Sequence, residues 1–213
     1  MPVRLAVTAD APPRLSRLGP VSGRANRAAL EGTAVSGARL ASRVGALGRR
    51  LARDYRGTEV VVVALLNGSV LFAADLIRHW PGPLKLDFVG VSSYRGGMRS
   101  GRLEFTKKLR LDVRGREVLL VDDILDTGRT LKAVRSRLES MGAARVRVCV
   151  LLDKEVRREP GIVAEYVGFR IPDWFVVGYG LDFEERWRNL PFIGVLRPPR
   201  EPAGRTLRPA AKP

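Results

Sequence analysis

The sequence predicts an α/β fold in which a central, mostly parallel sheet is flanked by helices. Two continuous apolar runs, 60–66 and 118–121, are typical of strands buried on both faces. Apolar residues at helical spacing precede the first run and follow the second. Strands that alternate with helices favour a parallel sheet with right-handed crossovers, and such sheets bind ligands beyond the carboxyl ends of their strands.

The first helix is predicted to begin at Ser36, whose side chain can cap it, and to end before Gly57. Its apolar stripe consists of Leu40, Val44, Leu47 and Leu51. The β-branched run at 60–66 then predicts a central strand. A turn at Asn67–Gly68 leads into a second helix, predicted over 69–80 and stopped by Pro81.

Residues 84–91 are predicted to form another strand, and the long polar stretch 92–108 is predicted to be a loop. Loops of more than about 12 to 15 residues in a compact domain are usually functional or mobile. This one carries most of a basic patch, formed by Arg95, Arg99, Arg102, Lys107, Lys108 and Arg110 and opposed by Glu104. Such a patch could steer a polyanionic small substrate or RNA, and charge alone does not choose between them.

The second half of the chain repeats the alternation. After the strand at 118–121, a helical stripe of Leu131, Val134, Leu138 and Met141 closes at Gly142. The next strand is predicted over 146–152. Three polar segments then lie at carboxyl ends of strands: Asn67–Gly68, 122–130 and Asp153–Lys154.

Composition and length favour one globular domain. The chain has 213 residues, of which 45% are hydrophobic. Its apolar stretches are far shorter than the roughly 20 residues of a membrane span, and Asp10 with the prolines at 12 and 13 interrupts any secretory signal, so we expect a cytoplasmic protein without a membrane partner. The single cysteine, Cys149, is expected to be a core residue in the 146–152 strand.

The formal net charge of +16 is spread along the whole chain. Residues 1–33 show no sustained periodicity and are expected to be a basic, flexible extension, and residues 197–213 a similar tail. The domain itself is expected over 34–196.

The stretch 118–131 is the most informative part of the sequence, because an apolar run ends in carboxylates and then in a turn of small residues. Thr127, Gly128 and Thr130 suit a phosphate-binding loop, since backbone N–H groups and the positive end of the following helix can converge on an anion. Asp122 and Asp123, beside such a pocket, suit a ribose diol or a Mg²⁺ ion.

This stretch resembles the phosphoribosyl pyrophosphate loop of the type I phosphoribosyltransferases, and every constrained position of that pattern is met. Three further segments, 152–154, 167–182 and 186–191, resemble the hypoxanthine-guanine phosphoribosyltransferases in particular. The similarity spans about residues 36–196. It implies the type I fold, with a small hood formed by C-terminal segments, and Mg²⁺-dependent transfer of a phosphoribosyl group to N9 of a 6-oxopurine.

The resemblance also implies roles for individual residues. The phosphoribosyl group would be held by Asp122, Asp123, Asp126, Thr127, Gly128, Arg129 and Thr130. Asp126 would also face purine N7 as the catalytic acid or base. Pyrophosphate would be bound by Asn67, Gly68, Ser93, Tyr94 and Arg188, where Asn67 departs from the family's common basic residue. The purine would contact Lys154, Phe175, Val176 and Asp182, and the metal would be held by Asp122, Asp123 and Asp182.

Lys154 would donate to the exocyclic O6 and so select oxopurines over adenine. The implied partners are phosphoribosyl pyrophosphate and the base, and the family tends to form homodimers or homotetramers. Two alternatives remain open: a xanthine-preferring transferase, and an RNA-binding regulator of pyrimidine genes on the same fold. Such regulators usually carry an aromatic residue where this chain has Asp126, so no specific nucleic-acid partner is expected.

Overall fold

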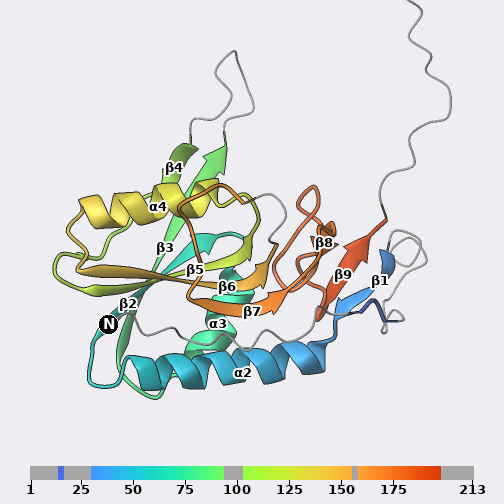
Figure 1. The fold of residues 1–213 in the computed structure, drawn as a ribbon, viewed down its shortest axis with the longest axis horizontal. Coiled ribbons are helices and arrows are strands. Elements are labelled where there is room, and N and C mark those ends of the chain that lie inside the picture. Colours follow the sequence, from blue (N-terminus) through green and yellow to red (C-terminus); the bar gives the residue numbers. More distant parts are fainter. Residues whose placement is uncertain (1–13, 17–29, 94–102, 155–157, 198–213) are drawn as a thin grey trace, which may run out of the picture.

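The computed structural model describes residues 14–16, 30–93, 103–154 and 158–197 (Figure 1). Its main sheet has the strand order β4-β3-β2-β5-β6-β7. These strands are β2 (Val60–Leu66), β3 (Leu84–Ser93), β4 (Leu103–Lys107), β5 (Glu117–Leu125), β6 (Arg145–Asp153) and β7 (Tyr166–Arg170). All neighbours are parallel except β3 and β4. The predicted mostly parallel sheet is therefore confirmed.

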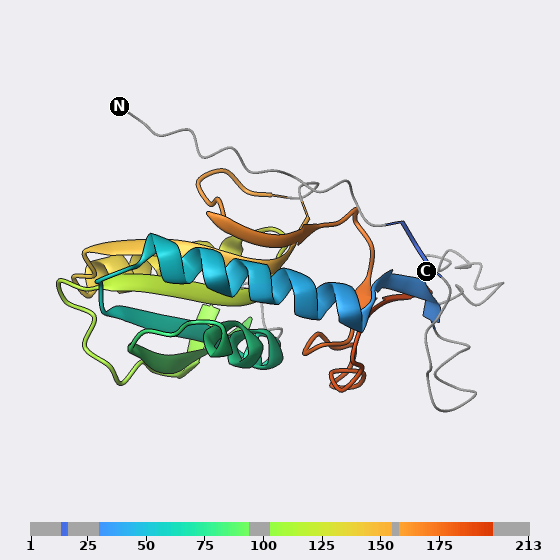
Figure 2. The same cartoon turned by 90° about the horizontal axis from the view of Figure 1, so that it is seen from below.

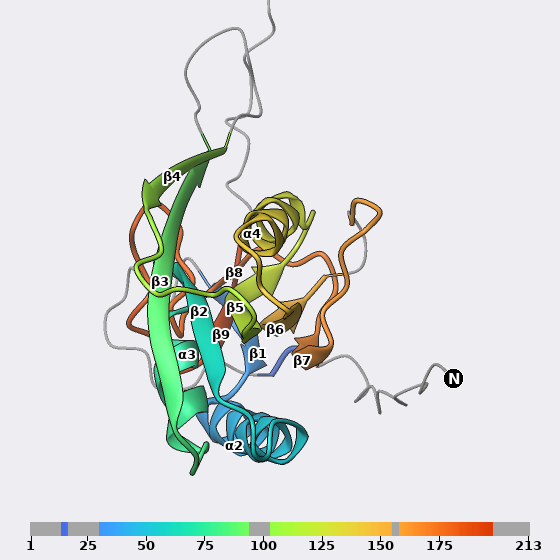
Figure 3. The same ribbon diagram turned by 90° about the vertical axis from the view of Figure 1, so that its left-hand side faces the viewer.

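Helices cover both faces of this sheet: α2 (Gly37–Asp54) and α3 (Val70–Arg78) on one side, and α4 (Arg129–Ser140) on the other (Figure 3). Strand β2 needs cover on both faces, because all but its last residue are buried and its side chains alternate between two cores. Val60, Val62 and Ala64 belong to the core under α2 and α3, whereas Val61, Val63 and Leu65 belong to the core under α4. Among the described residues, no helix is both long and apolar enough to cross a membrane.

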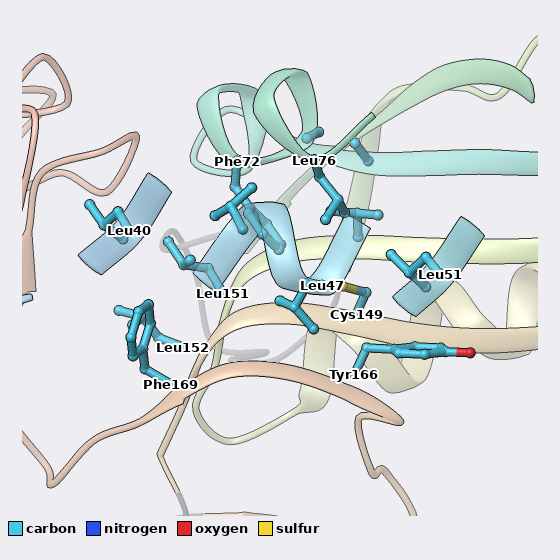
Figure 4. Packing of buried hydrophobic residues seen from close by; sticks show 14 of the residues in the cluster. Leu40, Leu47, Leu51, Phe72, Leu76, Cys149, Leu151, Leu152, Tyr166 and Phe169 are labelled. Carbon is cyan, nitrogen blue, oxygen red and sulfur yellow. The ribbon is translucent and has the colours of Figure 1, made fainter. Parts of the chain in front are cut away.

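The core under α2 and α3 is built from leucines and aromatic rings (Figure 4). Leu47 and Leu51 of α2, Phe72 and Leu76 of α3, and residues of β6 and β7 all belong to this core. Cys149 is completely buried there, and burial raises the pKa of its thiol. Its predicted role as a packing residue is confirmed.

The predicted helix ends agree with the structure to within two residues. Ser36 caps α2, and its hydroxyl oxygen accepts a hydrogen bond of 3.4 Å from the Arg39 N–H. Gly57 and Gly142 follow α2 and α4 with left-handed φ values of +77° and +87°. Helix α3 ends at Arg78, two residues before the predicted position.

A second, three-stranded antiparallel sheet forms a hood at one end of the molecule (Figures 1 and 2). Its order is β1 (Leu30–Val35), β9 (Ile193–Leu196), β8 (Val176–Val177). The hood therefore contains an N-terminal strand besides the predicted C-terminal segments. Residues 30–33, which we assigned to a flexible extension, lie in β1, so the boundary at residue 34 was placed too late. Leu30 is buried in the hood's own core, a contact with a distant segment that periodicity does not reveal.

The predicted loop at 92–108 is wrong in part, because β3 continues to Ser93 and β4 returns antiparallel beside it. Buried Asp87 of β3 anchors the far end of β4. Its carboxylate accepts hydrogen bonds from Lys107 Nζ, at 2.8 Å, and from the backbone N–H groups of Arg110 and Leu111. Lys107 is thus neutralised, while Arg95, Arg99 and Arg102 of the basic patch lie outside the described residues.

Candidate functional site

A cavity of about 600 Å³ opens at the carboxyl ends of β2 and β5, where the sheet faces the hood. It is lined by segments that are distant in sequence: the end of β2 and its turn into α3, part of β3 and β4, the stretch from β5 into α4, and the hood hairpin that follows β8. This is the place where parallel α/β sheets bind ligands. Most of the residues that we predicted for the phosphoribosyl and pyrophosphate groups line it.

The two acids lie inside β5 rather than after it. Asp122 pairs with Val150 of β6, and the Asp123 N–H donates a 3.0 Å hydrogen bond to Asp122 Oδ1. Burial, and then the neighbouring charge of Asp123, raise the pKa of Asp122 well above its usual value. Burial also raises the pKa of Asp123, although the nearby Arg188 guanidinium acts in the opposite direction. A ligand with cationic or hydroxyl groups would relieve this repulsion.

The turn after β5 presents backbone N–H groups to the cavity. Gly128 is the N-cap of α4 with φ +82° and has no side chain that could cap the helix. A Cβ atom there would lie 2.3 Å from Ile162 Cγ2, so the position needs glycine for space as well as for conformation. Thr127 and Thr130 line the cavity on either side of this helix start, and Arg129 is exposed and pairs with Glu159. The arrangement fits a phosphate group.

Asp126 lies in the same turn and lines the cavity. Its Oδ1 atom is buried and has no hydrogen-bond partner in the structure. Buried polar atoms are usually satisfied, and an unsatisfied one costs free energy. This oxygen is therefore available to an N–H donor of a ligand.

The β2–α3 turn contributes Asn67 and Gly68, and the Leu66–Asn67 peptide bond is cis. Gly68 is packed between two other walls of the cavity. A Cβ atom on Gly68 would overlap the Asp123 carboxylate, and a Cβ atom on Gly180 of the hood would lie 2.0 Å from the Gly68 carbonyl oxygen. The turn to which the resemblance assigns pyrophosphate binding is therefore packed tightly against Asp123 and Gly180.

The hood side of the cavity carries Asp182 and Arg188. Their charged groups pair at 2.8 Å, and Arg188 also donates to the Gly180 carbonyl at 2.8 Å and to Glu185 at 3.0 Å. The two residues were predicted for different ligands, the metal and pyrophosphate, yet here they bind each other. Glu185, which was not among the predicted site residues, also lines the cavity. The three-residue spacing between Glu185 and Arg188 could have indicated their ion pair.

Of the four residues predicted to contact the purine, Asp182 lines this cavity, whereas Lys154, Phe175 and Val176 do not. Lys154 is buried at the end of β6, its N–H donates to the Leu125 carbonyl at 2.9 Å, and its Nζ lies 3.6 Å from Asp173 Oδ1. Phe175 is 53% exposed and lines a separate cavity of about 520 Å³ in the hood, where its ring meets Phe183 edge-on at 5.4 Å. That Lys154 and Phe175 face Asp126 across one nucleoside stays a prediction, because the two residues lie at the end of β6 and in the hood respectively.

Val176, Ser93 and Tyr94 are the predicted site residues that remain to be placed. Val176 is buried in β8, which fits a contact through its backbone. Ser93 ends β3, and Tyr94 lies outside the described residues. Thr106 of β4 lines the cavity and was missed, because the stretch that contains it was interpreted as a loop. The alternation of Leu103, Glu104 and Phe105 could have indicated the strand.

Comparison with known proteins identifies relatives of the whole domain. Residues 36–184 match the family described as the phosphoribosyl transferase domain. The hypoxanthine-guanine phosphoribosyltransferase of Staphylococcus aureus is 46% identical over 153 residues, which are 71% of this chain and 86% of that protein. The Streptococcus pneumoniae protein of the same name is 46% identical over 152 residues, 71% of this chain and 84% of that protein.

A solved structure agrees with the sequence matches. The crystal structure of a hypoxanthine phosphoribosyltransferase from Staphylococcus aureus superposes with a TM-score of 0.78 at 40% identity. The alignment covers 84% of this chain and 97% of that chain. The likeness thus extends over nearly the full length of that protein.

Proposed function

Because this chain belongs to the phosphoribosyltransferase family, we propose that it transfers a phosphoribosyl group from phosphoribosyl pyrophosphate to N9 of hypoxanthine or guanine. The products are inosine or guanosine monophosphate and pyrophosphate, so the reaction salvages purines. The C1′–N9 bond forms while the bond between C1′ and the pyrophosphate oxygen breaks. The observation that carries this proposal is the unpartnered Asp126 oxygen beside the start of α4, in a chain 46% identical to two hypoxanthine-guanine phosphoribosyltransferases.

The reaction develops positive charge on the ribose and negative charge on pyrophosphate, so the site must offer opposite fields over a short distance. The N–H groups at the start of α4, with Thr127 and Thr130, bind the 5′-phosphate. Asp122 and Asp123 accept hydrogen bonds from the ribose hydroxyls and stabilise the positive ribose. The amides of Asn67 and Gly68, together with Arg188, bind pyrophosphate.

Asp126 acts on the base. Its free Oδ1 atom accepts a hydrogen bond from N7–H of the purine, and the carboxylate takes up the ring proton as N9 becomes bonded to C1′. On the other side of the base, the Lys154 ammonium donates to O6, Phe175 stacks on the ring, and the Val176 backbone meets the Watson–Crick edge.

The donor set fits Mg²⁺. Asp122, Asp123 and Asp182 offer only carboxylate oxygens, and within the described residues no cluster of three His, Cys, Asp or Glu side chains could hold a metal alone. Mg²⁺ is commonly bound by one or two carboxylates, with substrate phosphates and water as its other ligands. Asp122, Asp123 and Asp182 would hold the ion, which would neutralise negative charge on the pyrophosphate. Asp182 pairs with Arg188 in the structure and would be free for this role when Arg188 binds pyrophosphate.

An assay of nucleotide formation tests the proposal. Purified protein with phosphoribosyl pyrophosphate and Mg²⁺ is expected to use hypoxanthine and guanine, and to use adenine and uracil far less. Lys154→Met should weaken oxopurine use much more than phosphoribosyl pyrophosphate binding, and equal losses in both would contradict the base-reading role. No nucleotide product with either oxopurine would overturn the proposal.

The relatives do not favour the two alternatives, a xanthine-preferring enzyme and an RNA-binding regulator. Adding xanthine to the assay tests the first. RNA binding measured across a range of salt concentrations tests the second, since phosphate contacts give a steep salt dependence. Assembly into a homodimer or homotetramer stays a prediction, which a mass measurement in solution would check.

A further inference from the structure

We infer that Asp173 is a positioning residue for oxopurine recognition: it holds the Lys154 ammonium in the orientation in which it meets O6. The inference rests on the proposed function and adds a residue to it. Asp173 lies outside the cavity that holds Asp126 and was not among the predicted site residues. Its position in the β7–β8 connection, two residues before Phe175, places it on the segment that carries the base contacts.

The contact itself joins a buried cation to a half-buried anion. Lys154 Nζ lies 3.6 Å from Asp173 Oδ1, and the two side chains are 9% and 29% exposed. Among the described residues, Asp173 is the carboxylate that forms an ion pair with Lys154. A buried ammonium is costly without a counter-charge, so this partner has more influence here than in a surface pair.

The neighbouring acid is already engaged with another cation. Asp153 at the end of β6 pairs with Arg158, whose guanidinium also donates to the Lys154 carbonyl at 3.2 Å. Asp153 therefore neutralises Arg158 rather than Lys154. Among the described residues, Asp173 is thus the acid that balances the charge of the Lys154 ammonium.

The segment that carries Asp173 is fixed at both ends by backbone hydrogen bonds. Ile171 N–H donates to the Asp153 carbonyl at 3.0 Å, and Leu196 N–H of β9 donates to the Phe175 carbonyl at 2.8 Å. The Asp173 carboxylate is thus presented from a held loop, linked to the end of β6 and to the hood. Such support is what a residue needs if it is to orient another side chain.

An ammonium has three N–H donors and can bind a carboxylate and a carbonyl oxygen together. Asp173 can therefore stay beside the ammonium as its counter-charge while O6 accepts a hydrogen bond from one of its N–H groups. Without the Asp173 carboxylate, Lys154 keeps its ammonium group but loses the contact that orients it. Binding of the base should suffer, and binding of phosphoribosyl pyrophosphate on the far side of the site should not.

Steady-state kinetics of the full-length Asp173→Asn variant tests this inference. We expect KM for hypoxanthine to rise about tenfold, while KM for phosphoribosyl pyrophosphate stays within about twofold. Asp173→Glu, which keeps the charge, should recover part of the loss. Calorimetric titration gives an independent readout: inosine monophosphate should bind the Asn variant about tenfold more weakly, with phosphoribosyl pyrophosphate affinity unchanged.

Glu184→Gln is the matched control, because it removes one negative charge from the hood at an exposed residue that has no contact with Lys154. It should behave as the wild type. An Asp173→Asn variant with unchanged KM values, or with parallel changes for both substrates, would overturn the inference while the wild type remained active. A wild-type chain that makes no nucleotide would instead show that the proposed function itself is wrong, and the inference would fall with it.

Discussion

Gly68 lies directly against the carboxylate of Asp123, so that a Cβ atom at position 68 would stand 1.6 Å from Asp123 Oδ2. On its other side, the Gly68 carbonyl oxygen would stand 2.0 Å from a Cβ atom on Gly180 of the hood, which has φ +103°. A turn, a strand and the hood hairpin therefore share one contact that only glycine side chains permit. This contact sets the distance between the acids of β5 and the residues that come from the hood.

Gly68→Ala should displace Asp123, because the added methyl group cannot fit beside a carboxylate on a central strand. We expect kcat/KM for phosphoribosyl pyrophosphate to fall by at least about tenfold, since small misplacements of catalytic groups are costly. Gly82→Ala is the control, as its Cβ atom would find its nearest neighbour at 3.6 Å. Steady-state kinetics of both variants checks the prediction, and a fully active Gly68→Ala enzyme would contradict it.

Asp126→Asn should lower turnover by about 10²-fold or more, within the range of acid-base groups, and should leave the fold intact. The amide keeps the size of the side chain but cannot take up the purine proton. Turnover and thermal unfolding measured on the same preparation separate the two effects. Glu139→Gln, on the exposed side of α4, serves as the control, and unchanged turnover in Asp126→Asn would remove Asp126 from the mechanism.

Tyr179→Phe should loosen the hood from α3. The Tyr179 hydroxyl donates a 2.6 Å hydrogen bond to Asp75 Oδ2, and burial followed by this bond raises the pKa of Tyr179. Loss of one such bond should lower the free energy of unfolding by about 1 kcal/mol and raise KM for phosphoribosyl pyrophosphate. If the pair acts as a unit, Asp75→Asn should lower the free energy of unfolding less in the Tyr179→Phe variant than in the wild type. Strictly additive losses in the double variant would argue against this coupling.

Asp87→Asn should change how stability depends on pH. Burial disfavours its charge, but hydrogen bonds from Lys107 and from three backbone N–H groups outweigh burial and hold the pKa of Asp87 at about 2. A lowered carboxyl pKa stabilises the fold above about pH 4, and this contribution is lost as the pH falls from about 4 to 2. The variant should lose about 2 kcal/mol of unfolding free energy at pH 7.

Urea unfolding of Asp87→Asn and of the wild type between pH 2 and 7 checks this prediction, because the two curves should converge toward the acid end. Asp112→Asn supplies an exposed carboxylate paired with Arg114 for comparison. A variant that keeps the pH dependence of the wild type would show that Asp87 does not anchor β4.

The sequence by itself determined the elements whose signal is local. The β-branched run of β2, the Ser36 cap and the order of acids, glycine and hydroxyls after β5 all appear where they were predicted, because periodicity and turn chemistry depend on neighbouring residues. The family pattern then supplied the roles of these residues. Strand β4 was missed because its alternation is short and the polar stretch that contains it was interpreted as a loop; its pairing with the end of β3 became visible only in the structure.

Only the tertiary structure decided which distant segments meet. Contacts between Gly68 and Gly180, between Arg188 and Asp182, and between Lys154 and Asp173 depend on how the hood packs on the sheet. Such packing follows from the summed burial of many side chains, including Leu30 of β1, and no single stretch of sequence encodes it. For that reason the position of the segment proposed to bind phosphate, between β5 and α4, was predictable, whereas the pairing of the charges around the cavity was not.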